Sequence, residues 1–192
     1  MSTSLTGKVA VITGSSRSIG AAVAKHMASQ GAKVVVNYVN GADAASEVVS
    51  AIKTTGGIAV AVQADVSTIA GGQRLVDESI MDSKVLAEVD EAFYDAHFAT
   101  NVKGPLFLAK AAAKVLPAPG GRIIFFSTSL TGASTVSPTA LVYTATKGAV
   151  EQLSRILAKD GSPGAKGITV NTVSPGPVDT PLFRQGKPPA AH

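Results

Sequence analysis

The sequence predicts an α/β fold in which a doubly wound, mainly parallel sheet lies between two layers of helices. Three observations support this prediction. Short β-branched runs alternate along the chain with longer Ala-rich stretches. The runs are continuously apolar, as is typical of strands that are buried on both faces of a parallel sheet. Finally, the spacing of strand, helix and strand matches the βαβ unit, so we expect a Rossmann-like sheet.

The elements follow from these patterns and from the glycines that end them. Gly56-Gly57 provides the C-cap of one predicted helix, and Gly104-Pro105 interrupts another. The predicted strands cover residues 8–13, 33–38, 58–63, 121–126 and 168–173. The predicted helices cover residues 18–30, 42–55, 87–115 and 138–159, with a further helix ending near residue 80.

Composition places the chain among folded proteins. Its 192 residues are 45% hydrophobic and 16% charged, which suits one domain over residues 1–192, with a loop-like tail at 185–192. No apolar run approaches the ~18 residues of a membrane span, and the first residues lack a signal-peptide pattern. The sequence contains no cysteine, which fits a reducing compartment. We therefore expect a soluble, cytoplasmic protein that does not contact a membrane.

The basic, aromatic and histidine residues argue against nucleic-acid binding, a metal site and serine-hydrolase chemistry. The net charge of +4 comes from scattered basic residues, and aromatic residues make up only 5% of the chain, so we expect no nucleic-acid binding. His26, His97 and His192 do not cluster with acids at metal-ligand spacing, and none lies near Ser129. We therefore expect no metal site and no serine-hydrolase chemistry.

A glycine-rich turn follows the first strand. Residues 13–20 read TGSSRSIG, and the backbone N–H groups that begin the next helix attract a pyrophosphate. An ordinary strand-to-helix turn is the alternative. The candidate cofactor-binding residues here are Gly14, Ser16, Arg17, Ile19 and Gly20.

The choice of cofactor depends on the second strand. That strand ends Val36-Asn37-Tyr38 without the acid that binds the ribose of NAD, whereas Arg17 supplies a cation. This combination favours the 2′-phosphate of NADP(H), unless Arg17 is only a solvated turn residue. Asp65 and Val66 follow the third strand, where Asp65 either binds the adenine amino group or caps a helix.

A second group of residues resembles an acid–base site. Tyr143 and Lys147 are four residues apart at the start of a helix, so they point the same way. A neighbouring ammonium stabilises tyrosinate, so we expect it to lower the pKa of Tyr143. Ser129 follows the strand at 121–126, at the carboxyl end where such sheets bind ligands. An exposed helix pair is the alternative interpretation of Tyr143 and Lys147.

Together these residues resemble the short-chain dehydrogenase/reductase family over nearly the whole chain. The resemblance implies hydride transfer between NADP(H) and a small carbonyl or alcohol substrate. In that reaction Ser129 polarises the carbonyl oxygen, Tyr143 donates a proton, and Lys147 also holds the nicotinamide ribose. Blocks of the chain are most similar to 3-oxoacyl-[acyl-carrier-protein] reductases and to fungal polyketide or naphthol reductases.

Two further segments resemble the family. Asn101 maps to its fourth catalytic residue, and Pro105, four positions later, has no N–H to bond the Asn101 carbonyl. The family uses such a carbonyl to hold a water in a proton relay. The segment 175–180 resembles the nicotinamide loop, whose candidate residues are Pro175, Gly176, Val178 and Thr180, alongside Tyr143 and Lys147.

The chain also departs from the family. Ser18 replaces the middle glycine of the turn. A fourth strand that ends in an Asn-Asn-Ala-Gly turn is not found, and neither are the final strand and the substrate lid. These departures leave an alternative, namely an inactive spliced or truncated isoform. Such an isoform would act through its two long helices, which in the family pair subunits into dimers or tetramers.

Overall fold

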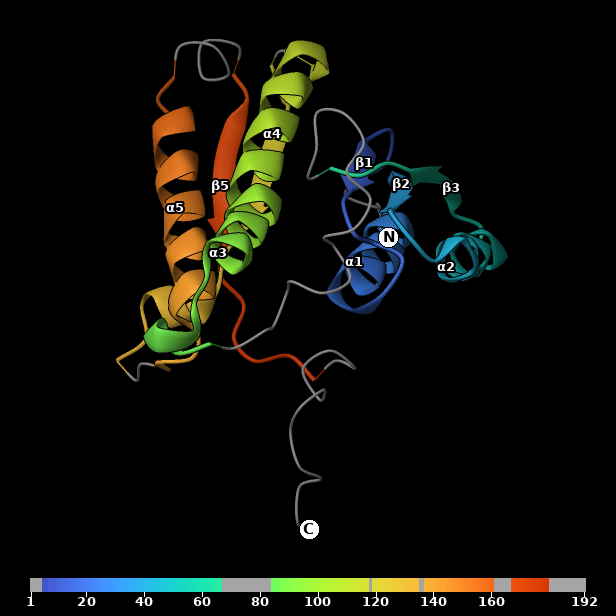
Figure 1. Ribbon diagram of the computed structural model, residues 1–192. Helices are drawn as coiled ribbons and strands as arrows, with labels where there is room; N and C mark the ends of the chain where they lie inside the picture. Colours follow the sequence, from blue (N-terminus) through green and yellow to red (C-terminus); the bar gives the residue numbers. More distant parts are fainter. Residues whose placement is uncertain (1–4, 67–83, 118, 135–136, 161–166, 180–192) are drawn as a thin grey trace. The chain divides into compact units, whose positions relative to one another are not determined.

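The computed structural model of the chain describes residues 5–66, 84–117, 119–134, 137–160 and 167–179 (Figure 1). These residues form two compact units, one ending at Asp65 and the other running from Val66 to Asp179. The single domain over residues 1–192 stays a prediction. The tail at 185–192 and most of the helix expected before residue 80 lie outside the described residues.

The first unit is a parallel sheet with its helices on one face. Its strands are β1 (Val9–Ile12), β2 (Lys33–Tyr38) and β3 (Ile58–Gln63), in the order β1-β2-β3. Helix α1 (Ser18–Ser29) connects the first two strands and α2 (Ala42–Thr54) connects the next two. The predicted bounds of β2 and β3 are confirmed, α1 and α2 each end one residue earlier than predicted, and β1 is one residue shorter at each end.

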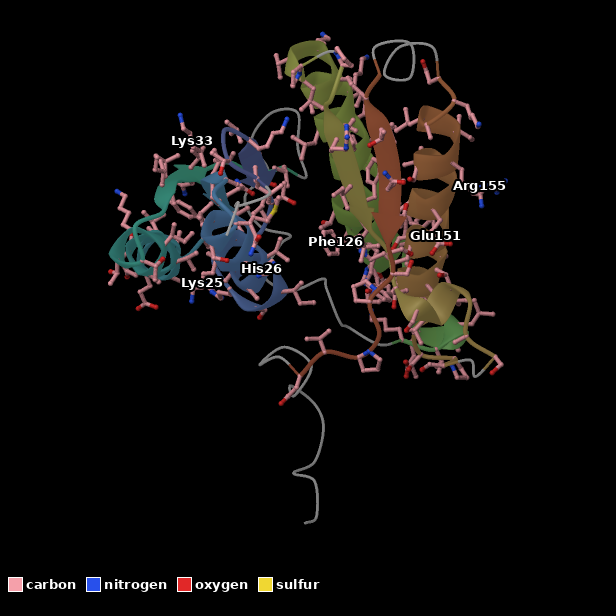
Figure 2. All side chains as sticks on the ribbon, turned by 180° about the vertical axis from the view of Figure 1, so that it is seen from behind. Lys25, His26, Lys33, Phe126, Glu151 and Arg155 are labelled. Carbon is pink, nitrogen blue, oxygen red and sulfur yellow. The ribbon has the colours of Figure 1, made fainter. Side chains whose placement is uncertain are left out.

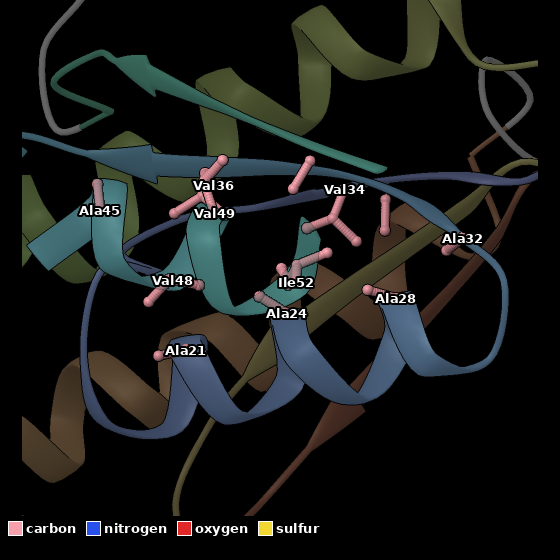
Figure 3. Close-up of a cluster of buried hydrophobic side chains, with 12 residues drawn as sticks. Ala21, Ala24, Ala28, Ala32, Val34, Val36, Ala45, Val48, Val49 and Ile52 are labelled. Atoms are coloured by element: carbon pink, nitrogen blue, oxygen red, sulfur yellow. The ribbon is translucent and has the colours of Figure 1, made fainter. Parts of the chain in front are cut away.

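Small side chains on α1 let it pack closely in this unit. Ala21, Ala24 and Ala28 are buried on one helix face, at the spacing of successive turns (Figure 3). They belong to one apolar cluster with Val34 and Val36 of β2 and with Val48, Val49 and Ile52 of α2 (Figure 3). Burying a side chain the size of Ile52 contributes about 1.5–3 kcal/mol. This cluster therefore fixes α1 and α2 on the same face of the sheet.

The second unit packs its helices against a pair of parallel strands. Strand β4 (Arg122–Phe126) pairs in parallel with β5 (Thr169–Val173). Its main helices are α3 (Glu91–Phe98), α4 (Gly104–Val115) and α5 (Leu141–Leu157). A core of Ala109, Phe125, Val150 and Val170 joins α4 and α5 to one face of the strand pair.

The long helix predicted over 87–115 changes its winding without ending. A short 3₁₀ turn, η1 (Leu86–Glu88), precedes α3, which begins after its N-cap Asp90. A π-helical segment, η2 (Ala99–Lys103), then joins α3 to α4. Because Pro105 cannot donate to the carbonyl four residues before it, a wider turn relieves the conflict. The predicted break at Gly104-Pro105 is thus a π-helical insertion.

Within its own unit, each sheet has described helices on one face. In the first unit Val9, Val11, Ile58, Val60 and Val62 share the face opposite the helices and are 43–66% exposed. In the second unit Ile124 and Phe126 alternate with the buried Phe125 and are 53% and 42% exposed. Burial of the strands on both faces therefore stays a prediction.

No described strand lies between β3 and β4 in the chain. Residues 84–117 contain helices and a single bridge between Lys84 and Ala140, and the two sheets remain separate. Hence β1 and β4 each pair with one described neighbour only. The absence of a fourth strand stays a prediction, because residues 67–83 lie outside the described residues.

None of the described helices is both long and apolar enough to span a bilayer.

The structure also shows what the replacement of glycine by Ser18 costs. Ser18, the first residue of α1, has φ +49°, and it is the one residue other than glycine with a positive φ among those described. The left-handed conformation costs an L-residue roughly 1–2 kcal/mol, and glycine avoids that cost.

We predict that Ser18→Gly raises the free energy of unfolding by up to about 1 kcal/mol. The relieved backbone strain at positive φ is larger than the entropic cost of ordering a glycine on folding. Chemical denaturation followed by circular dichroism would measure the change. The matched control is Ala22→Gly in the exposed interior of α1, which should lower stability by about 0.5–1 kcal/mol. Equal destabilisation by both variants would contradict the prediction.

Candidate active site

The glycine-rich turn of the first unit is fixed by buried polar groups. Gly14 has φ +59° and its N–H donates to Oδ1 of Asn37 at 3.2 Å. Ser15 is fully buried, and its hydroxyl donates to the carbonyl oxygen of Ile12 at 2.6 Å. The backbone N–H of Ser15 donates to the Asn37 carbonyl at 2.9 Å. The turn is therefore rigidly tied to β2.

The same turn brings the start of α1 close to β1. A Cβ on Gly20 would lie 2.6 Å from the carbonyl oxygen of Gly14 and 2.8 Å from the Ser15 Cα, so only glycine fits there. Arg17 and Ile19 are exposed on the outer side, and Ser16 is half-buried. The N–H groups of the first turn of a helix have no intrahelical partner, and they suit an anionic group such as a pyrophosphate. The residues present thus fit a dinucleotide.

Arg17 reaches the turn that follows β2. A Cβ on Gly41 would lie 2.5 Å from Nη2 of Arg17, so the guanidinium lies against the Gly41 backbone just before α2 begins. In a doubly wound sheet this end of the second strand is where the adenosine ribose is recognised. A guanidinium there suits a 2′-phosphate.

Asn37 has a structural role that the sequence did not reveal. Its side chain is buried, and its Nδ2 donates to the carbonyl oxygens of Val62 at 3.3 Å and Ala64 at 2.9 Å. Asp65 and Val66 follow these residues and are half-buried. The helix that Asp65 would cap lies outside the described residues.

Tyr143 and Lys147 lie on the first turns of α5, in the second unit. Nζ of Lys147 is 5.5 Å from the centroid of the Tyr143 ring. The same ammonium donates to the carbonyl oxygen of Phe126, at the end of β4, at 3.1 Å (Phe126 is labelled in Figure 2). An ammonium has three donors, so this bond leaves others for a ligand.

The electrostatics of the pair differ from the sequence expectation. Burial raises the pKa of Tyr143, and a hydrogen bond with the Thr128 side chain offsets only part of this rise. Burial likewise lowers the pKa of Lys147. The expected lowering of the Tyr143 pKa by the ammonium is therefore wrong for the free protein, because desolvation dominates and the ammonium bonds the Phe126 carbonyl.

Ser129 begins the 3₁₀ turn η3 (Ser129–Thr131), just beyond β4. Its side chain is exposed, and its backbone N–H donates to the carbonyl oxygen of Pro175 at 2.9 Å. Pro175 follows β5 and leads into Gly176 and Val178, both of which are exposed. The structure thus brings the Ser129 turn and the start of the predicted nicotinamide loop together. Thr180 lies outside the described residues.

Asn101 is placed beside α5 by the π-helical segment. Its Nδ2 donates to Oγ1 of Thr146 at 3.1 Å, and this buried hydroxyl donates in turn to the carbonyl oxygen of Tyr143 at 2.6 Å. Asn101 is therefore linked through one side chain to the backbone of the predicted catalytic tyrosine.

Sequence reasoning missed one polar residue in this unit. Glu151 lies one helical turn beyond Lys147 and accepts hydrogen bonds from three hydroxyl groups (Figure 2). The available signal was its spacing, since Tyr143, Lys147 and Glu151 recur every four residues and therefore share one side of α5.

The described histidines and acids form no group that would hold a metal ion. His97 is buried on α3, with Nδ1 2.8 Å from the carbonyl oxygen of Phe93, and its ring packs on the Phe93 ring. His97 therefore packs within the second unit.

Known proteins resemble this chain over most of its length. A family model described as short chain dehydrogenase matches residues 8–84, and one described as enoyl-(acyl carrier protein) reductase matches residues 79–190. The chain is 45% identical to Elsinochrome reductase 1 of Elsinoe fawcettii and 44% identical to the "Probable tetrahydroxynaphthalene reductase" of Zymoseptoria tritici. Each alignment covers 93% of this chain and 71% of the relative.

A solved structure gives the same result. The angucycline C-6 ketoreductase LanV with bound NADP superposes with a TM-score of 0.82 at 35% identity, over 95% of this chain and 78% of that one.

The alignments also contain gaps. They extend over 194 positions, yet 93% of 192 residues is about 179, so about 15 positions of each relative face no residue of this chain. That is the length of a strand and its turns.

The glycine-rich turn, the Tyr143–Lys147 pair and these matches lead to one conclusion: the chain belongs to the short-chain dehydrogenase/reductase family.

Proposed function

We propose that this oxidoreductase uses NADPH to reduce a ketone to an alcohol through Ser129, Tyr143, Lys147 and Asn101. The observation that carries the proposal is the arrangement in the second unit. There Lys147 on α5 donates to the Phe126 carbonyl at the end of β4, and Tyr143 shares a hydrogen bond with the Thr128 side chain. Just beyond, the Ser129 N–H donates to the Pro175 carbonyl.

NADPH is the proposed cofactor because of the first unit. Gly14, Ser16, Ile19 and Gly20 form the turn that would hold the pyrophosphate, and Arg17 would bind the 2′-phosphate. Asp65 and Val66 would contact the adenine, and Lys147, Pro175, Gly176, Val178 and Thr180 would contact the nicotinamide half. The NADP bound to LanV supports this assignment. When bound, NADPH supplies the hydride that adds to the carbonyl carbon.

The chain's own residues would handle the oxygen. The exposed Ser129 hydroxyl would donate to the carbonyl oxygen and polarise it. Burial raises the pKa of Tyr143, so its phenol keeps its proton near neutral pH and can donate it to the developing alkoxide. Lys147 would orient the cofactor ribose, and Asn101 would hold the water that returns a proton to Lys147.

The substrate class follows by analogy with the relatives. LanV is named an angucycline C-6 ketoreductase, and the two fungal relatives are named a tetrahydroxynaphthalene reductase and an elsinochrome reductase. A polycyclic aromatic ketone is therefore the substrate that we propose to test first.

The long helices are the proposed contact between subunits. Phe107, Leu108 and Val115 of α4 and Leu141 and Ile156 of α5 are 38–83% exposed, which is unusual for large apolar side chains. Their exposure supports the proposal of a homodimer or tetramer.

The first prediction concerns turnover. With a panel of aromatic ketones, we expect NADPH oxidation that Tyr143→Phe lowers by about 10²–10⁴-fold, because the phenol is the proton donor. NADPH should raise the melting temperature of both proteins, since the variant keeps the glycine-rich turn and Arg17. Absence of both turnover and a thermal shift in the wild type would instead favour the inactive isoform.

The second prediction concerns Arg17. A lost charge-assisted hydrogen bond costs about 1.5–3 kcal/mol, so Arg17→Ala should weaken NADPH binding by roughly 10–100-fold and leave NADH binding nearly unchanged. Fluorescence titration with each cofactor measures both constants. Lys25→Ala, an exposed cation on α1, is the control and should change neither. Equal loss for both cofactors would exclude the 2′-phosphate role.

The third prediction concerns the ionisation of Tyr143. The pKa of this phenol is raised from its ordinary value of about 10, so the protonated form persists through neutral pH and is lost only in more alkaline solution. Ultraviolet titration of the cofactor-free wild type minus Tyr143→Phe should show no tyrosinate signal below about pH 10. A difference step near pH 7–8 would contradict the burial argument.

A further inference from the structure

A single carboxylate oxygen of Glu151 accepts hydrogen bonds from three hydroxyl groups, two in the loop after β4 and one after β5. Its Oε1 accepts from Oγ of Ser127 at 2.7 Å, from Oγ1 of Thr131 at 2.6 Å and from Oγ of Ser174 at 3.4 Å. Ser127 follows β4, Thr131 ends η3 and Ser174 follows β5. One side chain of α5 therefore holds both of the loops that leave the carboxyl ends of the strand pair.

Each of these donors adjoins a residue of the proposed reaction. Ser127 and Thr131 lie two positions before and two positions after Ser129. Ser174 directly precedes Pro175, whose carbonyl accepts from the Ser129 N–H. The carboxylate thus fixes the Ser129 turn from both sides and the nicotinamide loop at its start.

The same helix carries Glu151 and the proposed proton donor. Glu151 is four residues beyond Lys147 and eight beyond Tyr143, so all three lie on one side of α5. In addition, Oγ of Ser127 lies 3.4 Å from the Lys147 carbonyl. Any displacement of the Ser129 turn relative to Tyr143 must therefore lengthen a hydrogen bond to the Glu151 carboxylate or the contact between Ser127 and the Lys147 carbonyl.

An ionised carboxylate suits this position. It is purely an acceptor, and its charge strengthens each of these hydrogen bonds, whereas the neutral oxygen of an amide would accept the same hydroxyls more weakly. The three hydrogen bonds hold the pKa of Glu151 below its ordinary value, with the Thr131 bond as the largest cause.

We propose that Glu151 is a positioning residue that sets Ser129 and the Pro175 loop against Tyr143 for the reduction. This inference rests on the proposed function for its catalytic consequence, although the tie between the loops and α5 does not. Without Glu151 the Ser129 hydroxyl would sample many positions, and oxygen stabilisation depends on a fixed donor.

A double-mutant cycle tests whether Glu151 acts through Ser129. In the wild type, Ser129→Ala should lower kcat/KM by about 10²–10³-fold, as for the loss of one oxyanion donor. In Glu151→Gln, itself slowed about tenfold or more, the same change should cost less than in the wild type by about that same factor, because the donor is already displaced. A merely structural role would lower the folded fraction and leave the two effects additive.

Hydrogen exchange tests the tie without any turnover. Glu151→Gln should speed amide exchange in residues 128–132 and 174–178 by about tenfold, because a charge-assisted bond is lost, and leave α2 unchanged. Gln152→Ala is the matched control on the same turn, since Gln152 is exposed and bonds Arg155 instead. If Glu151→Gln does not fold, Thr131→Val removes one donor and should speed exchange in the first segment alone.

The outcomes separate the two proposals. A wild type without ketone turnover overturns the proposed function, and hydrogen exchange then still decides the role of Glu151. Unchanged exchange in both segments, or additive effects in an active enzyme, would overturn the positioning role.

Discussion

The structure depends on how the chain satisfies its polar groups where parallel strands end. Beyond the last ladder bond, the backbone turns away and needs other partners. In the first unit Asn37 provides them, since its side chain accepts from Gly14 and donates to the carbonyls of Val62 and Ala64. In the second unit Glu151 does so for the loops after β4 and β5. One side chain in each unit thus fixes the loops that carry the candidate site residues.

Much of the fold could be predicted from local patterns. β-branched runs and Ala-rich stretches defined β2, β3, α1 and α2 almost to the residue, because propensity, burial and turn chemistry agree there. Pro105 indicated a conflict in the long helix, although not that a π-helical segment would absorb it. Whether strands are covered on one face or on both depends on packing between distant segments, which periodicity cannot reveal.

The candidate site, like the fold, could be predicted only in part. The residue types at Ser129, Tyr143 and Lys147 follow from spacing, whereas their pKa directions do not, because burial and the Phe126 carbonyl set them. Asn37 is the clearest case. In the sequence it marked the absence of an acid, yet in the structure it is a buried link among three strands. Glu151 was missed because its partners come from two segments, residues 127–131 and Ser174, that are distant from it in sequence.

The role of Asn37 limits how cofactor preference can evolve in this chain. An acid introduced at Asn37, one of the positions that end this strand, would point a carboxylate at the carbonyl oxygens of Val62 and Ala64, which now accept from the Asn37 amide. The change would leave those acceptors without their donor and bury a repelled charge among them. At this position, the preference for NADP(H) is therefore coupled to the stability of the sheet. An acid at Asn37 would need a second substitution that supplies hydrogen-bond donors to the carbonyls of Val62 and Ala64.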